Sequence, residues 1–361
     1  MTNIDSLIED SVQLLKDLIS TSSFSREETE TAFLLTQFLN NNQIETKQVG
    51  NNIIAFNKYI NPGLPFILLN SHHDTVKPNP GYSKDPFQPL VEDGKLYGLG
   101  SNDAGGCLVS LIAAFRYFYN QENLPFNICL IASAEEEVSG KGGIEEAYKH
   151  IPPCAFAIVG EPTQLELAIA EKGLMVLDCE AVGASGHAAR EEGINAIYLA
   201  IDAIQWFQHY QFPKQSQFLG PIKMSVTMIE AGSQHNVVPA SCKFVVDVRT
   251  TDVYSNVEVL EIIKQFVTCE VQARSTRLNP STIALDHPIV RAGQKLGKSV
   301  YGSPTMSDQA LLPIPSLKVG PGDSARSHSA DEYIYLQEIT DGINFYINIL
   351  NELIKSNEKI D

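Results

Sequence analysis

The sequence predicts an α/β protein in which helices cover both faces of a mixed sheet and a smaller α+β domain is inserted. Short apolar runs alternate with helical patterns along the first part of the chain, which is typical of an α/β layer. After Gly173 the order becomes strand, helix, strand, strand, helix, strand, the pattern of a ferredoxin-like fold. The α/β pattern resumes near His287. We therefore expect residues 1–173 and 286–361 to form one domain and residues 174–285 to be inserted into it.

The spacing of apolar residues indicates three helices before the insertion. Residues 5–19 are expected to form the first helix. In the second, Ser25 and Glu28 fit a capping box, and the apolar face is expected to consist of Phe33, Leu34, Phe38 and Leu39. The third helix covers residues 104–119.

Short apolar runs indicate the buried strands of the α/β domain. These runs are residues 65–70, 127–132, 155–159 and 317–319. In the inserted domain, residues 222–228 alternate apolar and polar side chains, as a half-exposed strand does. The other elements expected there are strands over 174–182, 242–249 and 269–274 and helices over 195–210 and 257–268.

The composition argues against several classes of protein. The chain has 361 residues, enough for about two domains. Lys and Arg number 26 and Asp and Glu number 43, so the formal net charge of −17 disfavours nucleic-acid binding. The sequence contains no apolar stretch of about 20 residues that would span a membrane, and its acidic N-terminus does not resemble a secretory signal. The six cysteines form no CxxC pair, which favours a reducing compartment and thus a cytoplasmic location.

Residues that can bind metals gather near the predicted strand ends. They occur in five segments: 71–74, 100–106, 133–137, 159–163 and 320–328. Ligands of open α/β sheets bind at the carboxyl ends of the strands, so these histidines and carboxylates are a candidate zinc site. A run of glutamates is usually a solvated face, but Glu135, Glu136 and Glu137 follow an apolar strand. Burying several carboxylates without a cation would cost many kcal/mol.

The order of these motifs resembles the co-catalytic zinc deacylases and peptidases, which include acetylornithine deacetylase, succinyl-diaminopimelate desuccinylase, aminoacylase-1 and carboxypeptidase G. The resemblance covers nearly the whole chain. His72-x-Asp74 matches the family's H-x-D, and residues 97–103 match its YGRGxxD loop. Residues 133–137 match TADEE, with Glu135 in place of aspartate, and residues 159–163 match VGEPT.

The resemblance implies a zinc-peptidase-like catalytic domain with two Zn²⁺ ions, for which Co²⁺ could substitute. His72, Asp103 and Glu161 would hold one ion. Asp103 would bridge to the second, which Glu137 and His328 would also hold. Glu136 would be the general base and acid, and Asp74 would orient His72.

The resemblance also implies roles for residues outside the metal site. His187, in a segment similar to G-x-x-x-H-A-x-x-P, would donate to the oxyanion in a partner subunit; the alternative is a histidine on a surface loop. Asn236 and Arg249 would bind substrate, and Arg249 would pair with the α-carboxylate of the substrate. The alternative for Arg249 is a salt bridge within the sheet. Ser307 and Gly320 lie in segments that match pocket-lining loops.

The function implied is a dinuclear zinc amidohydrolase that removes the acyl group from an N-α-acyl amino acid. Residues 72–77, 159–172 and 320–334 look most like acetylornithine deacetylase, which favours N-acetyl-L-ornithine, or an N-acetylcitrulline or N-succinylornithine-type analogue, in arginine biosynthesis. A homodimer through residues 174–285 is expected. The alternatives are a succinyl-diaminopimelate desuccinylase, a metal-dependent dipeptidase or carboxypeptidase, and an inactive metal-binding scaffold. A nucleotide-binding enzyme is disfavoured because the glycine fingerprints are missing.

Overall fold

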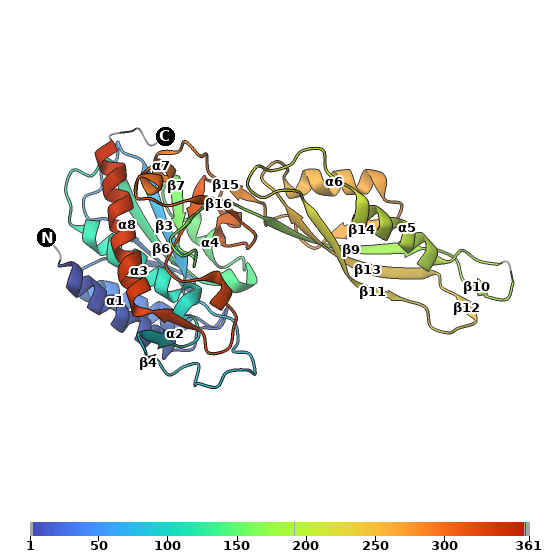
Figure 1. The fold of residues 1–361 in the computed structure, drawn as a ribbon, viewed down its shortest axis with the longest axis horizontal. Helices are drawn as coiled ribbons and strands as arrows, with labels where there is room; N and C mark the ends of the chain where they lie inside the picture. The colour runs from blue at the N-terminus through green and yellow to red at the C-terminus, as the bar shows by residue number, and fades with distance from the viewer. Residues whose placement is uncertain (1–2, 191, 357, 359–361) are drawn as a thin grey trace. The chain divides into compact units, whose positions relative to one another are not determined.

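The computed structural model of the chain describes residues 3–190, 192–356 and 358 (Figure 1). It divides into two compact units. The first unit consists of Met1–Ile169, Thr282–Tyr301 and Ser307–Asp361, and the inserted unit consists of Ala170–Ser281 and Gly302–Met306. Within the described ranges, none of the helices has the length and apolar character needed to cross a membrane.

The first unit is built on a nine-stranded mixed sheet in the order β1-β2-β6-β3-β7-β17-β8-β15, with β16 paired to β8. β3 lies parallel to β6 and β7, whereas β2 lies antiparallel to β1 and β6, so the predicted mixed sheet is confirmed. Its strands are β1 (Thr46–Val49), β2 (Asn52–Phe56), β3 (Phe66–His72), β6 (Asn127–Ser133), β7 (Cys154–Val159), β8 (Leu167–Glu171), β15 (Ser281–Thr282), β16 (Val300–Ser303) and β17 (Ser316–Lys318).

Helices cover both faces of this sheet, which explains why every residue of β3 and β6 is buried. On one face, α3 packs against β3 and is itself covered by α1 and α8 (Figure 1). On the other face, Ile144 and Ala147 of α4 join the core formed by Leu68 and Ile131. The helices are α1 (Ile4–Ile19), α2 (Thr29–Asn41), α3 (Gly106–Tyr119), α4 (Ile144–Tyr148), α7 (Pro288–Lys295) and α8 (Leu336–Ser356). A small sheet completes the unit, with β4 (Leu90–Glu92), β5 (Lys95–Tyr97) and β18 (Tyr333–Tyr335).

The capping box predicted for the second helix is wrong. α2 begins only at Thr29, and Glu28, its N-cap residue, makes no side-chain capping bond. The Ser25 hydroxyl donates instead to the Asp74 carboxylate at 2.7 Å. The predicted apolar face is also partly wrong, because Phe33 is 57% exposed and Leu35 is buried in its place.

The inserted unit has the predicted order of elements. Four antiparallel strands lie in the order β11-β13-β9-β14, and β10 pairs with β12 in a separate ribbon. Its elements are β9 (Gly173–Val182), β10 (Gly186–His187), α5 (Ala196–His209), β11 (Lys223–Ala231), β12 (Val237–Val238), β13 (Ser241–Thr250), α6 (Asn256–Phe266) and β14 (Glu270–Ala273).

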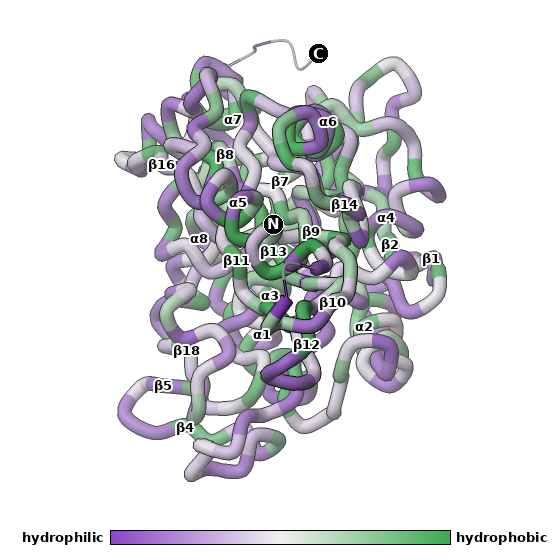
Figure 2. The backbone as a smooth tube through the Cα atoms, turned by 90° about the vertical axis from the view of Figure 1, so that its right-hand side faces the viewer, coloured by the Kyte–Doolittle hydropathy of each residue, from purple (hydrophilic) through white to green (hydrophobic). Residues whose placement is uncertain are grey.

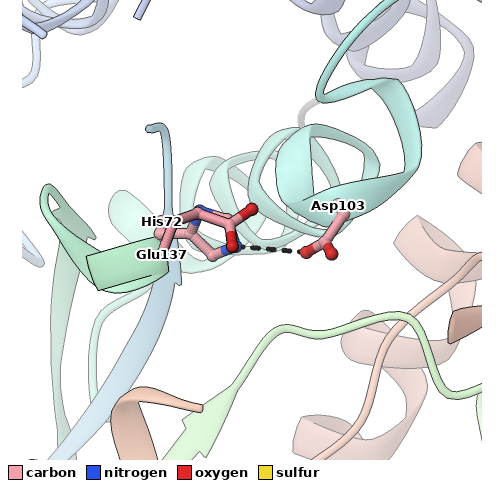
Figure 3. A group of neighbouring side chains, drawn as sticks. All are labelled: His72, Asp103 and Glu137. Carbon is pink, nitrogen blue, oxygen red and sulfur yellow. Dashed lines mark hydrogen bonds and ion pairs between the residues drawn. The ribbon is translucent and has the colours of Figure 1, made fainter. Parts of the chain in front are cut away.

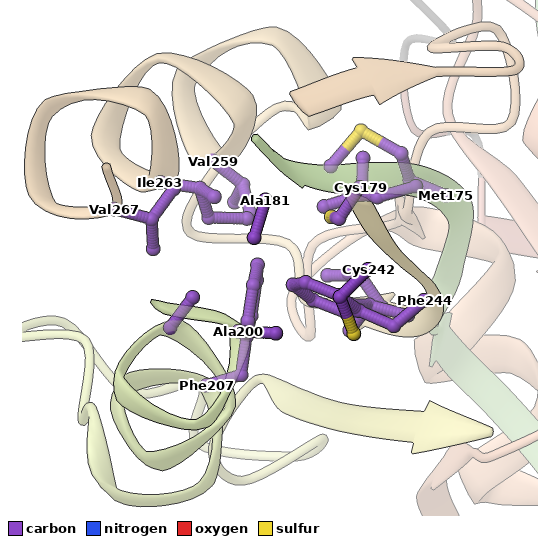
Figure 4. Close-up of a cluster of buried hydrophobic side chains, with 14 of the residues drawn as sticks. Met175, Cys179, Ala181, Ala200, Phe207, Cys242, Phe244, Val259, Ile263 and Val267 are labelled. Carbon is purple, nitrogen blue, oxygen red and sulfur yellow. The ribbon is translucent and has the colours of Figure 1, made fainter. Parts of the chain in front are cut away.

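The two helices of the inserted unit cover one face of its sheet. Figure 4 shows Ala200 and Phe207 of α5 and Ile263 of α6 gathered with Cys179 and Phe244 of the strands. In Figure 2, α6 is seen nearly end-on, with hydrophobic and hydrophilic residues distributed around its turns. This helix begins with a true capping box, made by Ser255 and Glu258. Val259 and Ile263, four positions apart on one side of α6, are buried in the core of the inserted unit.

Candidate metal centre and active site

Residues far apart in the sequence meet at the carboxyl edge of the first unit's sheet. His72 ends β3, and Glu161 follows β7 by two residues. Since β3, β6 and β7 are parallel, their carboxyl ends lie at the same edge. Short turns carry Asp103, Glu136 and Glu137 to this edge, and these turns are η1 (Ser101–Gly105) and η2 (Glu136–Val138). His328 follows a third turn, η4 (Ser324–Arg326).

His72 lies at the centre of the cluster. Its Nε2 atom is 3.3 Å from Asp103 Oδ1, 3.8 Å from Glu161 Oε1 and 3.9 Å from Glu136 Oε2. Figure 3 shows His72, Asp103 and Glu137 pointing toward one another from three different segments. The donor atoms of these three residues lie within 4.8 Å of one another, as do those of His72, Glu136 and Glu161.

Asp103 stands between two imidazoles. Its Oδ1 atom faces His72, while its Oδ2 atom is 3.7 Å from Nε2 of His328. The same Nε2 atom is 2.9 Å from Glu137 Oε2. The structure thus brings together all five residues predicted as metal ligands. Distance alone does not separate Glu136 from the predicted ligands, so its role as general base stays a prediction, as do theirs.

The charges of this cluster suit divalent cations. Burial raises the pKa of Glu161 to about 8, and it also raises the pKa values of Glu136 and Glu137. Burial alone would lower the pKa of His72, but its hydrogen bonds with Asp103 and Asp74 raise that pKa. Without metal, protons must supply the positive charge that the carboxylates need. Imidazole nitrogens and carboxylate oxygens are zinc donors, so bound ions would replace these protons.

Asp74 supports the cluster in two ways. Its backbone carbonyl accepts a hydrogen bond from Nδ1 of His72 at 2.9 Å, whereas its carboxylate is 3.5 Å from that atom. A neutral His72 in this tautomer presents the Nε2 lone pair toward Asp103. The Asp74 carboxylate accepts the backbone N–H groups of Glu136 at 3.0 Å and Glu137 at 3.2 Å. Asp74 therefore orients the histidine mainly through its backbone and holds η2 through its side chain.

Sequence reasoning missed two buried carboxylates beside the cluster. Asp308 accepts the Ser133 hydroxyl at 2.5 Å, and burial raises the pKa of Asp308 to about 6. Glu332 accepts the backbone N–H of Asp103 at 2.9 Å, and burial raises the pKa of Glu332 to about 8. Asp308 stands next to the predicted Ser307, and Glu332 lies four positions after His328. Only this proximity in the sequence could have indicated them.

Ser307 and Gly320 are both buried. The Ser307 hydroxyl accepts the Gln309 N–H at 3.4 Å and caps η3 (Asp308–Leu311). Gly320 donates its N–H to the Thr163 hydroxyl at 3.1 Å. A Cβ at Gly320 would come within 2.6 Å of the Glu161 carbonyl oxygen, so a side chain there would clash with the loop that carries Glu161. Substrate binding by Ser307 and Gly320 stays a prediction.

The inserted unit brings His187 and Asn236 together but not Arg249. His187 pairs with Val237, next to Asn236, in the β10–β12 ribbon beyond the Val182 end of β9. Arg249 pairs with Leu174 at the other end of β9. Its guanidinium makes a two-pronged ion pair with Asp247, at 2.8 and 3.1 Å. The salt bridge within the sheet, weighed as the alternative for Arg249, is therefore present.

A cluster of histidines and carboxylates at the open edge of a mixed α/β sheet, with an α+β unit inserted in the chain, defines a metal-dependent hydrolase. The sequence comparisons agree with this class. The chain belongs to peptidase family M20/M25/M40, whose profile matches residues 68–352. The protein is accordingly a metal-dependent hydrolase that acts on amides.

Curated relatives match almost the full chain. An acetylornithine deacetylase of Proteus mirabilis is 28% identical over 357 residues, which cover 90% of this chain and 91% of the relative. A succinyl-diaminopimelate desuccinylase of a Ruegeria species is 24% identical and covers 97% of both chains. A hydrolase of LysW-lysine and LysW-ornithine from Sulfurisphaera tokodaii is 28% identical over 80% of this chain and 81% of its own.

Solved structures share the fold. Bacillus subtilis YxeP, described as a dinuclear metal-binding peptidase of the M20 family, superposes with a TM-score of 0.75 at 16% identity. The alignment covers 97% of this chain and 99% of YxeP. Aminopeptidase PepT of Bacillus cereus gives a TM-score of 0.74 at 19% identity, covering 96% of this chain and 98% of PepT.

Metal removal should make the stability of the protein fall as pH rises from about 5 to about 8. In the metal-free fold, Glu161 keeps its proton up to a pKa of about 8, whereas unfolded glutamates lose theirs near about 4.3. The folded state then binds more protons than the unfolded state, so stability is lost across this window. Bound metal replaces the protons, so the Tm gap between metal-loaded and chelated protein should widen with pH. Calorimetry that shows a constant or narrowing gap would contradict the charge balance described here.

Proposed function

We propose that this chain removes the acyl group from an N-α-acyl amino acid, with N-acetyl-L-ornithine as the first candidate substrate. N-acetylcitrulline and N-succinylornithine-type analogues come next, and the reaction would serve arginine biosynthesis. The observation that carries the proposal is the position of Asp103 between His72 and His328. The acetylornithine deacetylase relatives, at 28% identity, support the family of amide hydrolases, and the substrate within it is our proposal.

Two divalent ions would be held by side chains that the fold already gathers. His72, Asp103 and Glu161 would hold one, and Asp103, Glu137 and His328 the other. Zn²⁺ fits these imidazole and carboxylate donors, and Co²⁺ could replace it. When bound, the ions polarise the amide carbonyl and lower the pKa of water in the site.

Glu136 would move the proton. It would take a proton from the attacking water and deliver it to the leaving amine nitrogen. Three observations support this role: Glu136 lies at the cluster, it is largely buried, and its backbone N–H is held by Asp74. The raised pKa of Glu136, caused first by burial, suits a group that must both accept and release a proton.

We further propose that His187 donates to the oxyanion and that Asn236 and Arg249 bind substrate. Arg249 has five N–H donors and uses two on Asp247, so the others remain for a substrate carboxylate. The stretch of β9 from Leu174 to Val182 spans roughly 26 Å, whereas an N-acyl amino acid spans roughly 10 Å. His187 and Arg249 of one chain therefore cannot hold the same substrate molecule, which supports a role for His187 in a partner's site.

The partner would be a second copy of this chain. β11 is an end strand of its sheet, and its outer edge faces no strand among the described residues. Met228 and Ile229 of β11 are 64% and 58% exposed, and Tyr198 of α5 is 68% exposed. An apolar surface beside an unpaired strand edge suits a homodimer contact through the inserted unit. We place the enzyme in the cytoplasm because all six cysteines are free thiols.

A desuccinylase is the second candidate, favoured by the Ruegeria relative that covers 97% of this chain. A panel of N-acetylornithine, N-acetylcitrulline, N-succinylornithine and succinyl-diaminopimelate, with dipeptides added, separates the candidates. We expect the highest kcat/KM on N-acetylornithine. Higher kcat/KM on succinyl-diaminopimelate or on a dipeptide would overturn this substrate, and inactivity of the metal-loaded protein on every compound would favour a scaffold.

Substituting Glu136→Gln should lower kcat by about 10²- to 10⁴-fold while both metal ions stay bound, because the amide cannot transfer the proton. Glu135→Gln is the matched control. The Glu135 side chain turns toward Gly140 and Gly142 instead of the cluster, so its variant should stay within a few-fold of wild type. Steady-state kinetics with metal analysis tests both. Wild-type kcat in Glu136→Gln would show that Glu136 is not the base.

Mixing two inactive variants tests the partner role of His187. His187→Ala lacks the oxyanion donor, and Glu136→Gln lacks the base, so each should be inactive alone. In a mixed dimer, one site would regain both groups, and random assortment would restore about a quarter of wild-type activity. The two variants carry different affinity tags, so mixed dimers can be isolated. Isolated mixed dimers with no recovered activity would disprove action in the partner's site.

A further inference from the structure

We propose that Glu332 is a positioning residue that fixes Asp103, the carboxylate that would hold both proposed metal ions, by holding the backbone of its loop. The inference rests on the proposed metal centre. Among the described residues, Glu332 forms no hydrogen bond or ion pair with His72 or His328. It would act on the metals through the loop that carries Asp103.

The Glu332 carboxylate accepts three backbone N–H groups of one loop. Its Oε1 atom is 2.8 Å from the N atom of Asn102 and 2.9 Å from that of Asp103. Its Oε2 atom is 3.0 Å from the N atom of Gly100. The Glu332 carbonyl oxygen also accepts the Gly98 N–H at 3.0 Å. With only 2% of Glu332 exposed, this carboxylate is committed to the loop instead of to solvent.

The loop needs this acceptor because its own conformation does not supply one. Asp103 has φ −119° and ψ 98°, outside the helical region, so η1 is not a regular turn. Buried N–H groups without acceptors are costly, and a carboxylate forms stronger bonds with them than a neutral group. The loop also leads directly into α3, whose N-terminal end favours a nearby negative charge.

The same contacts join the two segments that carry Asp103 and His328. Glu332 lies four residues after His328 and bonds to the Asp103 loop. Asn102, in turn, donates its side-chain amide to the Asp323 carbonyl and accepts the Asp323 N–H, both at 3.0 Å. Two independent links therefore fix the position of Asp103 relative to His328. Oδ2 of Asp103 lies 3.7 Å from Nε2 of His328.

Substituting Glu332→Gln tests the inference. Glutamine keeps the size of the side chain, but its NH₂ group would face a backbone N–H, so one bond becomes a repulsion. We expect metal affinity to fall by about 10- to 100-fold, the range found when residues behind the ligands are changed. The visible absorption of the Co²⁺-loaded protein should change, and kcat should fall more than KM rises.

The neighbouring Asp331 provides a matched control. Its carboxylate also accepts two backbone N–H groups, from Ser83 at 2.8 Å and Lys84 at 2.9 Å, but in a different loop. Asp331→Asn should therefore cost stability without changing metal affinity or the Co²⁺ spectrum. A Glu332→Gln protein that binds both ions with wild-type affinity and spectrum would overturn the inference, even if its Tm fell.

A measurement on the unmodified protein covers the case in which Glu332→Gln fails to fold. If the Glu332 bonds favour metal binding, metal binding must favour those bonds by the same factor. Hydrogen exchange at Gly100, Asn102 and Asp103 should then slow on metal loading, whereas exchange at Ser83 and Lys84 should not. Unchanged exchange in the Asp103 loop would overturn the inference. Wild-type protein that binds no metal would instead overturn the proposed function.

Discussion

The concentration of negative charge at one edge of the first unit's sheet is the constraint on which the rest of this structure depends. Asp103, Glu136, Glu137 and Glu161 converge on His72 within a few ångströms. Buried carboxylates repel one another and lose their hydration, so such a cluster is stable only with compensating positive charge. The pKa values of Glu136, Glu137 and Glu161 are raised for this reason. Either protons or divalent cations can supply the compensating charge.

Because the cluster is repulsive, the segments that carry it need anchors. Further buried carboxylates provide them through backbone N–H groups. Asp74 holds the turn of Glu136 and Glu137, and Glu332 holds the loop of Asp103. Glu28 accepts the N–H of Glu135 at 3.2 Å, one residue before that turn. Asp103, Glu136 and Glu137 thus sit on irregular turns that further acids keep in place. The strands bring those turns to a common edge with His72, the last residue of β3.

The strands, the order of elements in the insertion and the clustering of the five predicted ligands could be predicted from the sequence, because strand ends and local motifs carry that information. The anchors could not. Glu332 lies 229 positions from the Asp103 N–H that it accepts, and no local pattern marks such a bond. Ser25 shows the same limit. Its spacing from Glu28 fits a capping box, but a carboxylate 49 positions away takes its hydroxyl. Arg249 shows the same limit, since the sequence alone left open whether Arg249 forms an ion pair with Asp247.

Relatives named for different substrates match this chain at similar levels, 28% for an acetylornithine deacetylase and 24% for a desuccinylase. The features that these relatives share with this chain therefore indicate amide hydrolysis. They do not indicate which acyl group or side chain the substrate carries. We therefore expect specificity to come from residues outside the cluster. The residues that we propose to contact substrate form two separate sets in the inserted unit, His187 with Asn236 at one end of its sheet and Arg249, paired with Asp247, at the other. A change of substrate could then alter either set while the first unit's carboxylates, constrained by their mutual repulsion, stay as they are.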